Sequence, residues 1–331
     1  MALLKKKTVA GFIERDSGVN HKTFKLPQTA PLAAVLLLMF IIFSFTSEYF
    51  FQVDNFRNIL ANAAVTGIVC IPGTFLVISG QIDLSVGSAA AVSGMILAQV
   101  VNHHGVGFGL LSILIYGLAL GCFNGLIVTV IGVNPLITTL GGLGFLYGVA
   151  LLIGNGQTLG MKNFDWLGTA QPLGVPLPVI IFFALALAGA VTLKYSKFGR
   201  SIYAIGSNPN AARVVGIRSN RIIFQTFVLS ALAASLAGAV LASQLSSGDP
   251  NAGIGLELQV VTAIVLGGAS LAGGRGSIFG TVLGLLIVGV LNNGLILVNV
   301  PTFWQRIAQG LTLIIAVSFD AIRGKLAKRK N

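Results

Sequence analysis

Charge is what this 331-residue sequence has least of. Only 9% of its residues are Asp, Glu, Lys or Arg, whereas an ordinary soluble domain carries about 25%. Hydrophobic residues make up 55% of the chain, and the mean hydropathy is +0.90. A soluble chain of this length could not cover its surface with so few charges. The composition therefore excludes a soluble enzyme, a nucleic-acid-binding domain and a disordered protein.

The motifs of catalysis and of cofactor binding are also missing. No phosphate loop of the form GxxxxGK[ST] occurs, so we expect the chain neither to bind nor to hydrolyse ATP. HExxH and GxSxG are absent, and the two cysteines lie in apolar runs without a CxxC pair, so no metal site is expected. Ionisable residues are scarce inside the apolar runs, which argues against proton or sodium coupling. The sequence predicts a non-enzymatic protein without a cofactor of its own.

Long uncharged runs are what the sequence does have. A membrane helix needs about 20 largely apolar residues, and the longest run without a charge, Leu84–Met161, has 78. Together these runs predict an all-α, polytopic membrane bundle of about ten spans, at 31–46, 58–79, 86–101, 108–131, 135–153, 176–193, 222–244, 256–270, 277–298 and 304–319. Among these predicted spans, 256–270 is the least regular, because it is short and glycines interrupt it. We expect residues 31–319 to form the transmembrane domain between two polar tails, 1–30 and 320–331.

The distribution of basic residues gives an orientation. Seventeen of the 21 Lys and Arg lie in the N-terminal tail, in the loop 194–221 and in the C-terminal tail. The positive-inside rule places all three clusters in the cytoplasm, and an even number of spans agrees, with both termini on that side. The basic charge is then a topology signal with some attraction to anionic membrane lipid, and nucleic acid is not an expected partner.

Glycines spaced four apart occur in two predicted spans that are five spans apart. They are Gly117, Gly121 and Gly125 in the span 108–131, and Gly276, Gly280 and Gly284 at the start of the span 277–298. Residues four apart share a helix face, where glycine lets two backbones approach. The recurrence predicts a five-plus-five repeat, as in many transporters. The alternative is the small-residue packing that recurs in any polytopic protein.

The polar side chains inside the predicted spans are neutral. Asn124, Asn292 and Asn293 lie on Gly-rich spans in the two candidate halves. Neutral hydrogen-bonding groups suit a neutral, hydroxyl-rich solute, so we expect these three residues near a substrate pathway. Hydrogen bonding between helices is the alternative explanation.

Three motifs stand at the span boundaries. The first, Gly80–Ser88, contains Asp83, which caps the next helix, takes part in gating or subunit coupling, or contacts the substrate directly. The second, Phe198–Ile217, predicts a short cytoplasmic helix that Asn208 and Pro209 begin and Gly216 ends, with small side chains suited to a partner's groove. The third, Gly255–Ser277, contains Gly267 and Gly268, which imply tight turns or a broken helix, structural or gating in role.

In this order and spacing, the three motifs resemble those of the permease subunits of monosaccharide ABC importers. These form the ribose-type branch of a family that also holds branched-chain amino-acid permeases. The resemblance runs from about residue 51 to residue 319. The segment Asn210-Ala211-Ala212-xxx-Gly216 is similar to the family's ATPase-coupling loop, Glu-Ala-Ala-xxx-Gly, with Asn in place of Glu. In the first motif, Gln81 replaces the family's second glycine.

The resemblance implies a multi-pass permease of the bacterial inner membrane that forms the path of a ribose-like monosaccharide. It implies three partners: a cytoplasmic ABC ATPase that binds ATP and Mg²⁺, a periplasmic sugar-binding protein, and a second permease, identical or homologous. The ATPase would dock on the loop 194–221, through Gly199, Arg200, Asn210, Ala211, Ala212, Arg213 and Gly216. Alternatives are a branched-chain amino-acid or quorum-signal sugar permease, or an ion-coupled secondary transporter.

Overall fold

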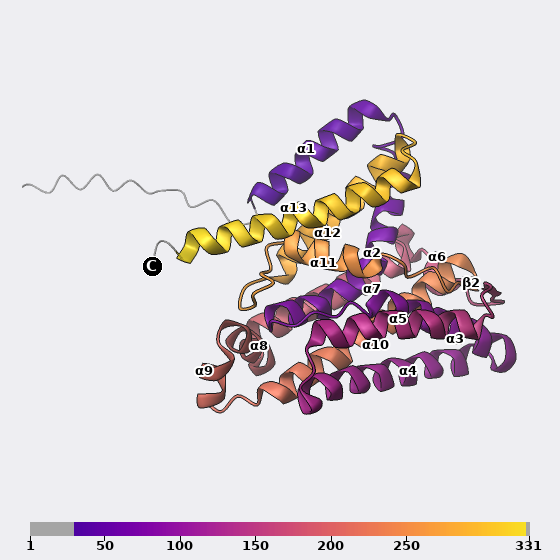
Figure 1. The fold of residues 1–331 in the computed structure, drawn as a ribbon. Helices are drawn as coiled ribbons and strands as arrows, with labels where there is room; N and C mark the ends of the chain where they lie inside the picture. Colours follow the sequence, from indigo (N-terminus) through magenta and orange to yellow (C-terminus); the bar gives the residue numbers. More distant parts are fainter. Residues whose placement is uncertain (1–29, 329–331) are drawn as a thin grey trace, which may run out of the picture.

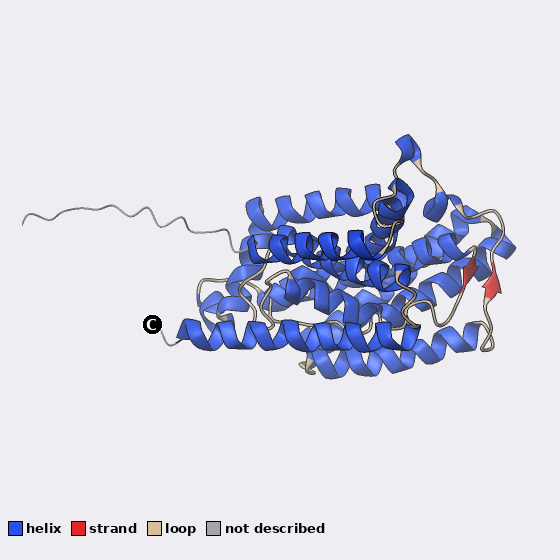
Figure 2. Ribbon diagram, turned by 90° about the horizontal axis from the view of Figure 1, so that it is seen from above, coloured by secondary structure: helices blue, strands red, loops and turns tan. Residues whose placement is uncertain are grey.

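The computed structural model describes residues 30–328, with side chains as far as Ile322. This part of the chain is a bundle of long helices with two very short strands (Figure 2). The long helices are α1 (Ala30–Thr46), α2 (Val53–Ile78), α3 (Val86–His104), α4 (Val106–Leu126), α5 (Pro135–Ile153), α7 (Leu177–Tyr195), α10 (Ser219–Leu245), α12 (Ile278–Leu297) and α13 (Thr302–Lys328). Shorter elements are η1 (Ile127–Ile131), β1 (Leu159–Gly160), α6 (Trp166–Thr169), η2 (Pro172–Gly174), α8 (Lys197–Ser207), α9 (Pro209–Val214), β2 (Ser247–Gly248) and α11 (Leu256–Leu266).

A helix lies in every one of the ten predicted ranges, and local capping explains where several of them begin. The Asn134 side chain accepts a hydrogen bond from the Leu136 amide at 2.9 Å, and Pro135 is the first residue of α5. The Ser277 hydroxyl accepts a hydrogen bond from the Gly280 amide at 3.0 Å, and Ser277 is the N-cap residue of α12. These starts are fixed by residues next to the helix, which is why the sequence predicts them well.

The number of helices that could cross a membrane differs from the number predicted. Seven of the described helices are long and apolar enough: α2, α3, α4 with η1, α5, α7, α10 and α12. Helix α1 is apolar but has 17 residues, and α11 has only 11. At about 1.5 Å per residue, α11 covers only about half of a hydrocarbon core of about 30 Å. The predicted span 256–270 is therefore wrong in length, and the count of ten spans stays a prediction.

The bundle has two ends, which we name by what they carry (Figure 1). The basic end carries α8 and α9, the start of α1 and the end of α13. The strand end, opposite, carries β1 and β2, which pair antiparallel with Leu159 opposite Gly248. The described ends of the chain therefore lie at the same end of the bundle as the basic loop, the arrangement expected from the charges. The side of the membrane that each end faces remains a prediction.

The pattern of helix contacts agrees with a duplication of four helices in each half. Helix α3 packs on α4, α5 and α10. Helix α11 makes the corresponding contacts in the other half, with α12, α13 and α2 in that order. The contact between α4 and α10 likewise corresponds to the contact between α12 and α2. The first helix of each half, α1 or α7, does not follow this scheme. The repeat is thus matched by α2–α5 and α10–α13, around a buried centre where α2, α3 and α10 contribute most of the core.

The two glycine runs both lie at close helix contacts, but the contacts are not equivalent. Gly121 on α4 approaches the backbone of α10, where an added Cβ would lie 2.5 Å from the Cα of Val228. Gly284 on α12 instead faces the carbonyl oxygen of Ala263 on α11. The runs therefore share a packing role, and their spacing alone is a weaker sign of the repeat than the contact pattern.

Candidate functional site

The short helix α9 is exposed at the surface of the basic end. The Asn208 side chain accepts hydrogen bonds from the amides of Asn210 and Ala211, at 3.1 and 3.0 Å, and Pro209 is the first helical residue. The helix ends at Gly216, whose φ of +83° is the left-handed conformation that favours glycine. The predicted short helix and both of its caps are confirmed.

Of the predicted docking residues, only some face outward. Asn210, Ala211 and Arg213 are exposed, but Ala212 is only 2% exposed. Ala212 packs against its own chain, so our expectation that it fills a partner's groove is corrected, because its side of α9 faces α8 and α10. The exposed face also includes two residues that the sequence analysis missed, Val214 at 87% and Val215 at 74% exposed. A pair of apolar residues within a polar, basic loop was the signal that could have identified them.

Helix α8 connects α9 to the bundle. The Ser196 hydroxyl accepts a hydrogen bond from the Gly199 amide at 2.9 Å and begins the helix. Gly199 is buried against the backbone of Thr192 and Leu193, so it serves the turn between α7 and α8 and is not on the docking surface. Arg200 is exposed and donates to the Tyr195 carbonyl oxygen at 3.1 Å.

The second and third sequence motifs meet at the C-terminal end of α8, against the last residue of α2, just before the first motif. The Gly274 amide donates a hydrogen bond to the Ile78 carbonyl oxygen at 2.8 Å. Gly206, at the end of α8, lies so close to both groups that an added Cβ would collide with them. The Tyr203 hydroxyl donates to the Gly276 carbonyl oxygen at 2.8 Å. We call this contact of α8, the end of α2 and the loop 267–277 the motif junction. It joins the predicted docking segment to both halves of the bundle.

Gly267 and Gly268 lie at the start of the loop 267–277. Gly267 faces the Gly280 carbonyl oxygen so closely that a Cβ would collide with it. Gly268 has a φ of +90° and ends α11 in the left-handed conformation. The packing of α11 against α12 and the early end of α11 both require these glycines. The structure thus places them in a tight turn, as one of the two readings of the sequence expected.

Asp83 lies in a buried polar cluster between α2 and α3. One carboxylate oxygen accepts from the Ser85 amide at 3.0 Å and from the Ser85 hydroxyl at 2.6 Å. The other accepts from the Ser230 hydroxyl on α10 at 3.0 Å. Asn124 on α4 donates to the Ser85 hydroxyl at 3.3 Å. The expectation that Asp83 caps the next helix is wrong, because the N-cap residue of α3 is Ser85 and no side chain caps this helix. The cluster instead ties the start of α3 to α4 and α10. Ser230 and Asn124 carried no local signal of this contact.

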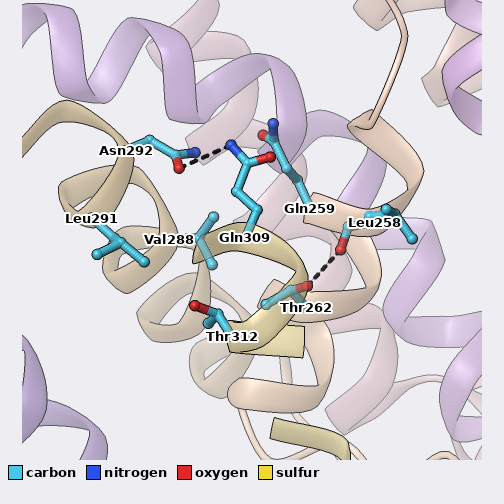
Figure 3. Close-up of a pocket in the computed structure, with 8 residues that line it drawn as sticks. All are labelled: Leu258, Gln259, Thr262, Val288, Leu291, Asn292, Gln309 and Thr312. Atoms are coloured by element: carbon cyan, nitrogen blue, oxygen red, sulfur yellow. Dashed lines mark hydrogen bonds between the residues drawn. The ribbon is translucent and has the colours of Figure 1, made fainter. Parts of the chain in front are cut away.

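Asn292 and Asn293 lie elsewhere, in a cavity of about 250 Å³ between α2, α11, α12 and α13. Asn124, which we grouped with them, is buried in the Asp83 cluster and does not line this cavity. Gln259, Gln305 and Gln309 line it as well. Figure 3 shows the adjoining part, where the Gln309 side chain lies between Asn292 and Gln259. Gln305 and Gln309 are four residues apart on α13, a spacing that could have drawn attention to them.

Residues 55–317 match the model of a protein family described as branched-chain amino acid transport system / permease component. The chain belongs to this family. It is 40% identical to the ribose import permease protein RbsC of Escherichia coli K12, over 89% of this chain and 94% of the relative. It is 39% identical to RbsC of Bacillus subtilis, over 86% and 90% of the two chains. It is 33% identical to the L-arabinose ABC transporter permease protein AraH of Azospirillum brasilense, over 91% and 89%. No solved structure matches the chain.

Family membership and the apolar helices together identify a multi-pass membrane protein that is a transport subunit and not an enzyme. The match covers both the docking segment and the amide-lined cavity, from Asn62 to Gln309. The resemblance inferred from the three motifs is therefore confirmed.

Proposed function

We propose that this chain is the membrane permease subunit of a binding-protein-dependent ABC importer for a monosaccharide, with a ribose-like pentose favoured. Relatives that align over 86–91% of this chain are named for ribose and arabinose. A separate cytoplasmic ATPase, which binds ATP and Mg²⁺, docks on α9 and powers transport. A periplasmic sugar-binding protein delivers the solute at the strand end, and a second permease completes the path in the bacterial inner membrane.

One observation of the structure supports this proposal above the others. The exposed helix α9 directly follows the motif junction in the chain, where Gly206 at the end of α8 touches the end of α2 and the loop between α11 and α12. A force applied to α9 by an ATPase would therefore reach both halves of the bundle. An ion-coupled transporter would need no such exposed segment, and it would need ionisable groups along its path.

Transport by the reconstituted complex tests the proposal. The chain is placed in proteoliposomes with its ATPase and binding protein, and uptake of ribose, arabinose and leucine is measured with ATP or with a non-hydrolysable analogue. We expect ribose uptake that requires ATP hydrolysis. Uptake of leucine in place of sugar would identify a branched-chain amino-acid permease. Sugar uptake driven by a proton or sodium gradient without ATP would identify a secondary transporter.

A further inference from the structure

The cavity at the strand-end half of the bundle combines two properties that a solute site needs. It is lined by amide side chains, those of Asn62, Gln259, Asn292, Asn293, Gln305 and Gln309, and none of its lining residues is charged. Apart from Thr66, its remaining walls are apolar, among them Ile59, Leu285 and Val288. A volume of about 250 Å³ is large enough for several water molecules, and so for a small solute.

Five of the amides are held at one end by the protein. Asn293 donates through Nδ2 to Asn55 at 2.8 Å, and Gln305 donates through Nε2 to the Val300 carbonyl oxygen at 2.8 Å. Gln309 donates through Nε2 to Oδ1 of Asn292 at 3.1 Å (Figure 3). Gln259 accepts through Oε1 from the Thr66 hydroxyl at 3.3 Å. These bonds fix the direction of each side chain, so that a ligand would find the groups already oriented.

The other end of each amide has no hydrogen bond within the described residues. Three oxygens are left as acceptors, on Asn293, Gln305 and Gln309, and two nitrogens as donors, on Gln259 and Asn292. The Asn293 oxygen is fully buried by the surrounding protein and does not face the open cavity. The unengaged amide ends of Gln259, Asn292, Gln305 and Gln309 are accessible, so they are the groups that a ligand in the cavity can reach.

The chemistry of these groups selects among solutes. A hydroxyl both donates and accepts, and it therefore matches a mixed set of amide oxygens and nitrogens. The apolar walls match the C–H faces of a sugar ring. A zwitterionic amino acid would bring an ammonium and a carboxylate group into a cavity without an opposite charge, which is unfavourable.

We propose that this cavity is the contact site for the monosaccharide within the membrane, and that the unengaged amide ends of Gln259, Asn292, Gln305 and Gln309 hydrogen-bond its hydroxyls. The proposal rests on the proposed function and deepens it, because it names the groups that recognise the solute.

The test uses the complete transporter in proteoliposomes at saturating sugar-loaded binding protein, so that the sugar affinity of the binding protein does not limit the rate. Asn292→Leu and Gln309→Met remove the unengaged amide ends, together with the hydrogen bond between these two side chains, while keeping side-chain size. We expect ribose transport to fall about 3- to 10-fold, the range of one or two net hydrogen bonds. Each variant is also assayed with 2-, 3- and 5-deoxyribose. One of these sugars lacks the hydroxyl that the substituted residue contacts, and for that sugar the variant's transport rate should fall much less than it does for ribose.

A matched control is Asn220→Leu, at the basic end, where the amide donates to the Thr129 carbonyl oxygen outside the cavity. It should not change the relative rates of the four sugars. If the wild type carries ribose and the two cavity variants slow all four sugars equally, or slow none, the cavity is not the contact site. If the wild type carries no monosaccharide, the proposed function itself is wrong.

Discussion

The carbonyl oxygen of Ile78 accepts a hydrogen bond from the amide of Gly274, 2.8 Å away, and Gly206 fills the space beside them. This contact joins residues from three distant parts of the sequence. It involves backbone atoms only, and it leaves no room for a side chain at residue 206. The motif junction therefore depends on glycine for a steric reason.

Gly206→Ala should destabilise the protein by about 1–3 kcal/mol, because the new Cβ would force the end of α2 and the loop 267–277 apart. Thermal unfolding of the purified protein in detergent measures this. The matched control is Gly144→Ala on α5, where a Cβ meets no atom within 4 Å. Equal stability of the two variants would contradict the steric role of Gly206.

Gly216→Val should strain the end of α9 by about 1–2 kcal/mol, because a β-branched residue rarely adopts its φ of +83°. No atom lies within 4 Å of an added Cβ, so the effect is conformational. We expect weaker co-purification of the ATPase and slower sugar uptake with normal membrane insertion. Gly216→Asn, which tolerates this conformation, should retain more of both. If Val and Asn behave alike, the cap does not control docking.

Val214→Asp should reduce co-purification of the ATPase at least 10-fold if the exposed face of α9 is the dock. Val214 is 87% exposed, so insertion and thermal stability should remain at wild-type levels. Leu173→Asp makes the same change at a fully exposed residue of the strand end and should leave ATPase binding intact. Normal binding by the Val214 variant would place the dock elsewhere.

Asp83→Leu should cost about 3 kcal/mol or more, because the Ser85 amide and the Ser85 and Ser230 hydroxyls would lose their acceptor in a buried site. The comparison is Asp54→Ala, which removes an ion pair with Arg57 from a side chain that is 83% exposed, worth about 0–1 kcal/mol. Both are measured by thermal unfolding in detergent. Similar unfolding temperatures would mean that the Asp83 cluster does not stabilise the bundle.

The orientation of the bundle can be tested with reporters. A reporter fused to the C-terminus should be active only in a format that requires the cytoplasm, because α13 ends at the same end of the bundle as the basic loop (Figure 1). A reporter inserted at Leu173 should be active only in a periplasmic format. Activity of both reporters on one side of the membrane would show that our assignment of the spans is wrong.

The sequence predicts the helices well because their limits depend on neighbouring residues. Asn134 and Pro135 begin α5 where expected, and Asn208 and Gly216 bound α9. Helix α11 ends earlier than predicted because Gly267 must lie against Gly280, a contact between helices that no local pattern reveals.

The site is harder to predict, for the same reason. Asn124, Asn292 and Asn293 are alike in sequence, but the first bonds to Ser85 in the Asp83 cluster and the other two line the cavity. Ala212 is buried while its neighbours on α9 are exposed. Residue type and spacing identify the polar groups of a membrane protein, but only the tertiary arrangement separates those that bind each other from those left for a solute.

The pairing of β1 with β2 has a consequence for engineering the protein. The two strands have two residues each and join the loop after α5 to the loop after α10. A single inserted residue within Leu159–Gly160 would turn the strand's side chains to the opposite face and misplace Phe164, which is buried close by. Leu173 lies further along the same connection and is fully exposed. It belongs neither to the strand pair nor to the buried surroundings of Phe164. An epitope tag or fluorescent label for single-molecule work should therefore be accepted at Leu173 and rejected at Leu159.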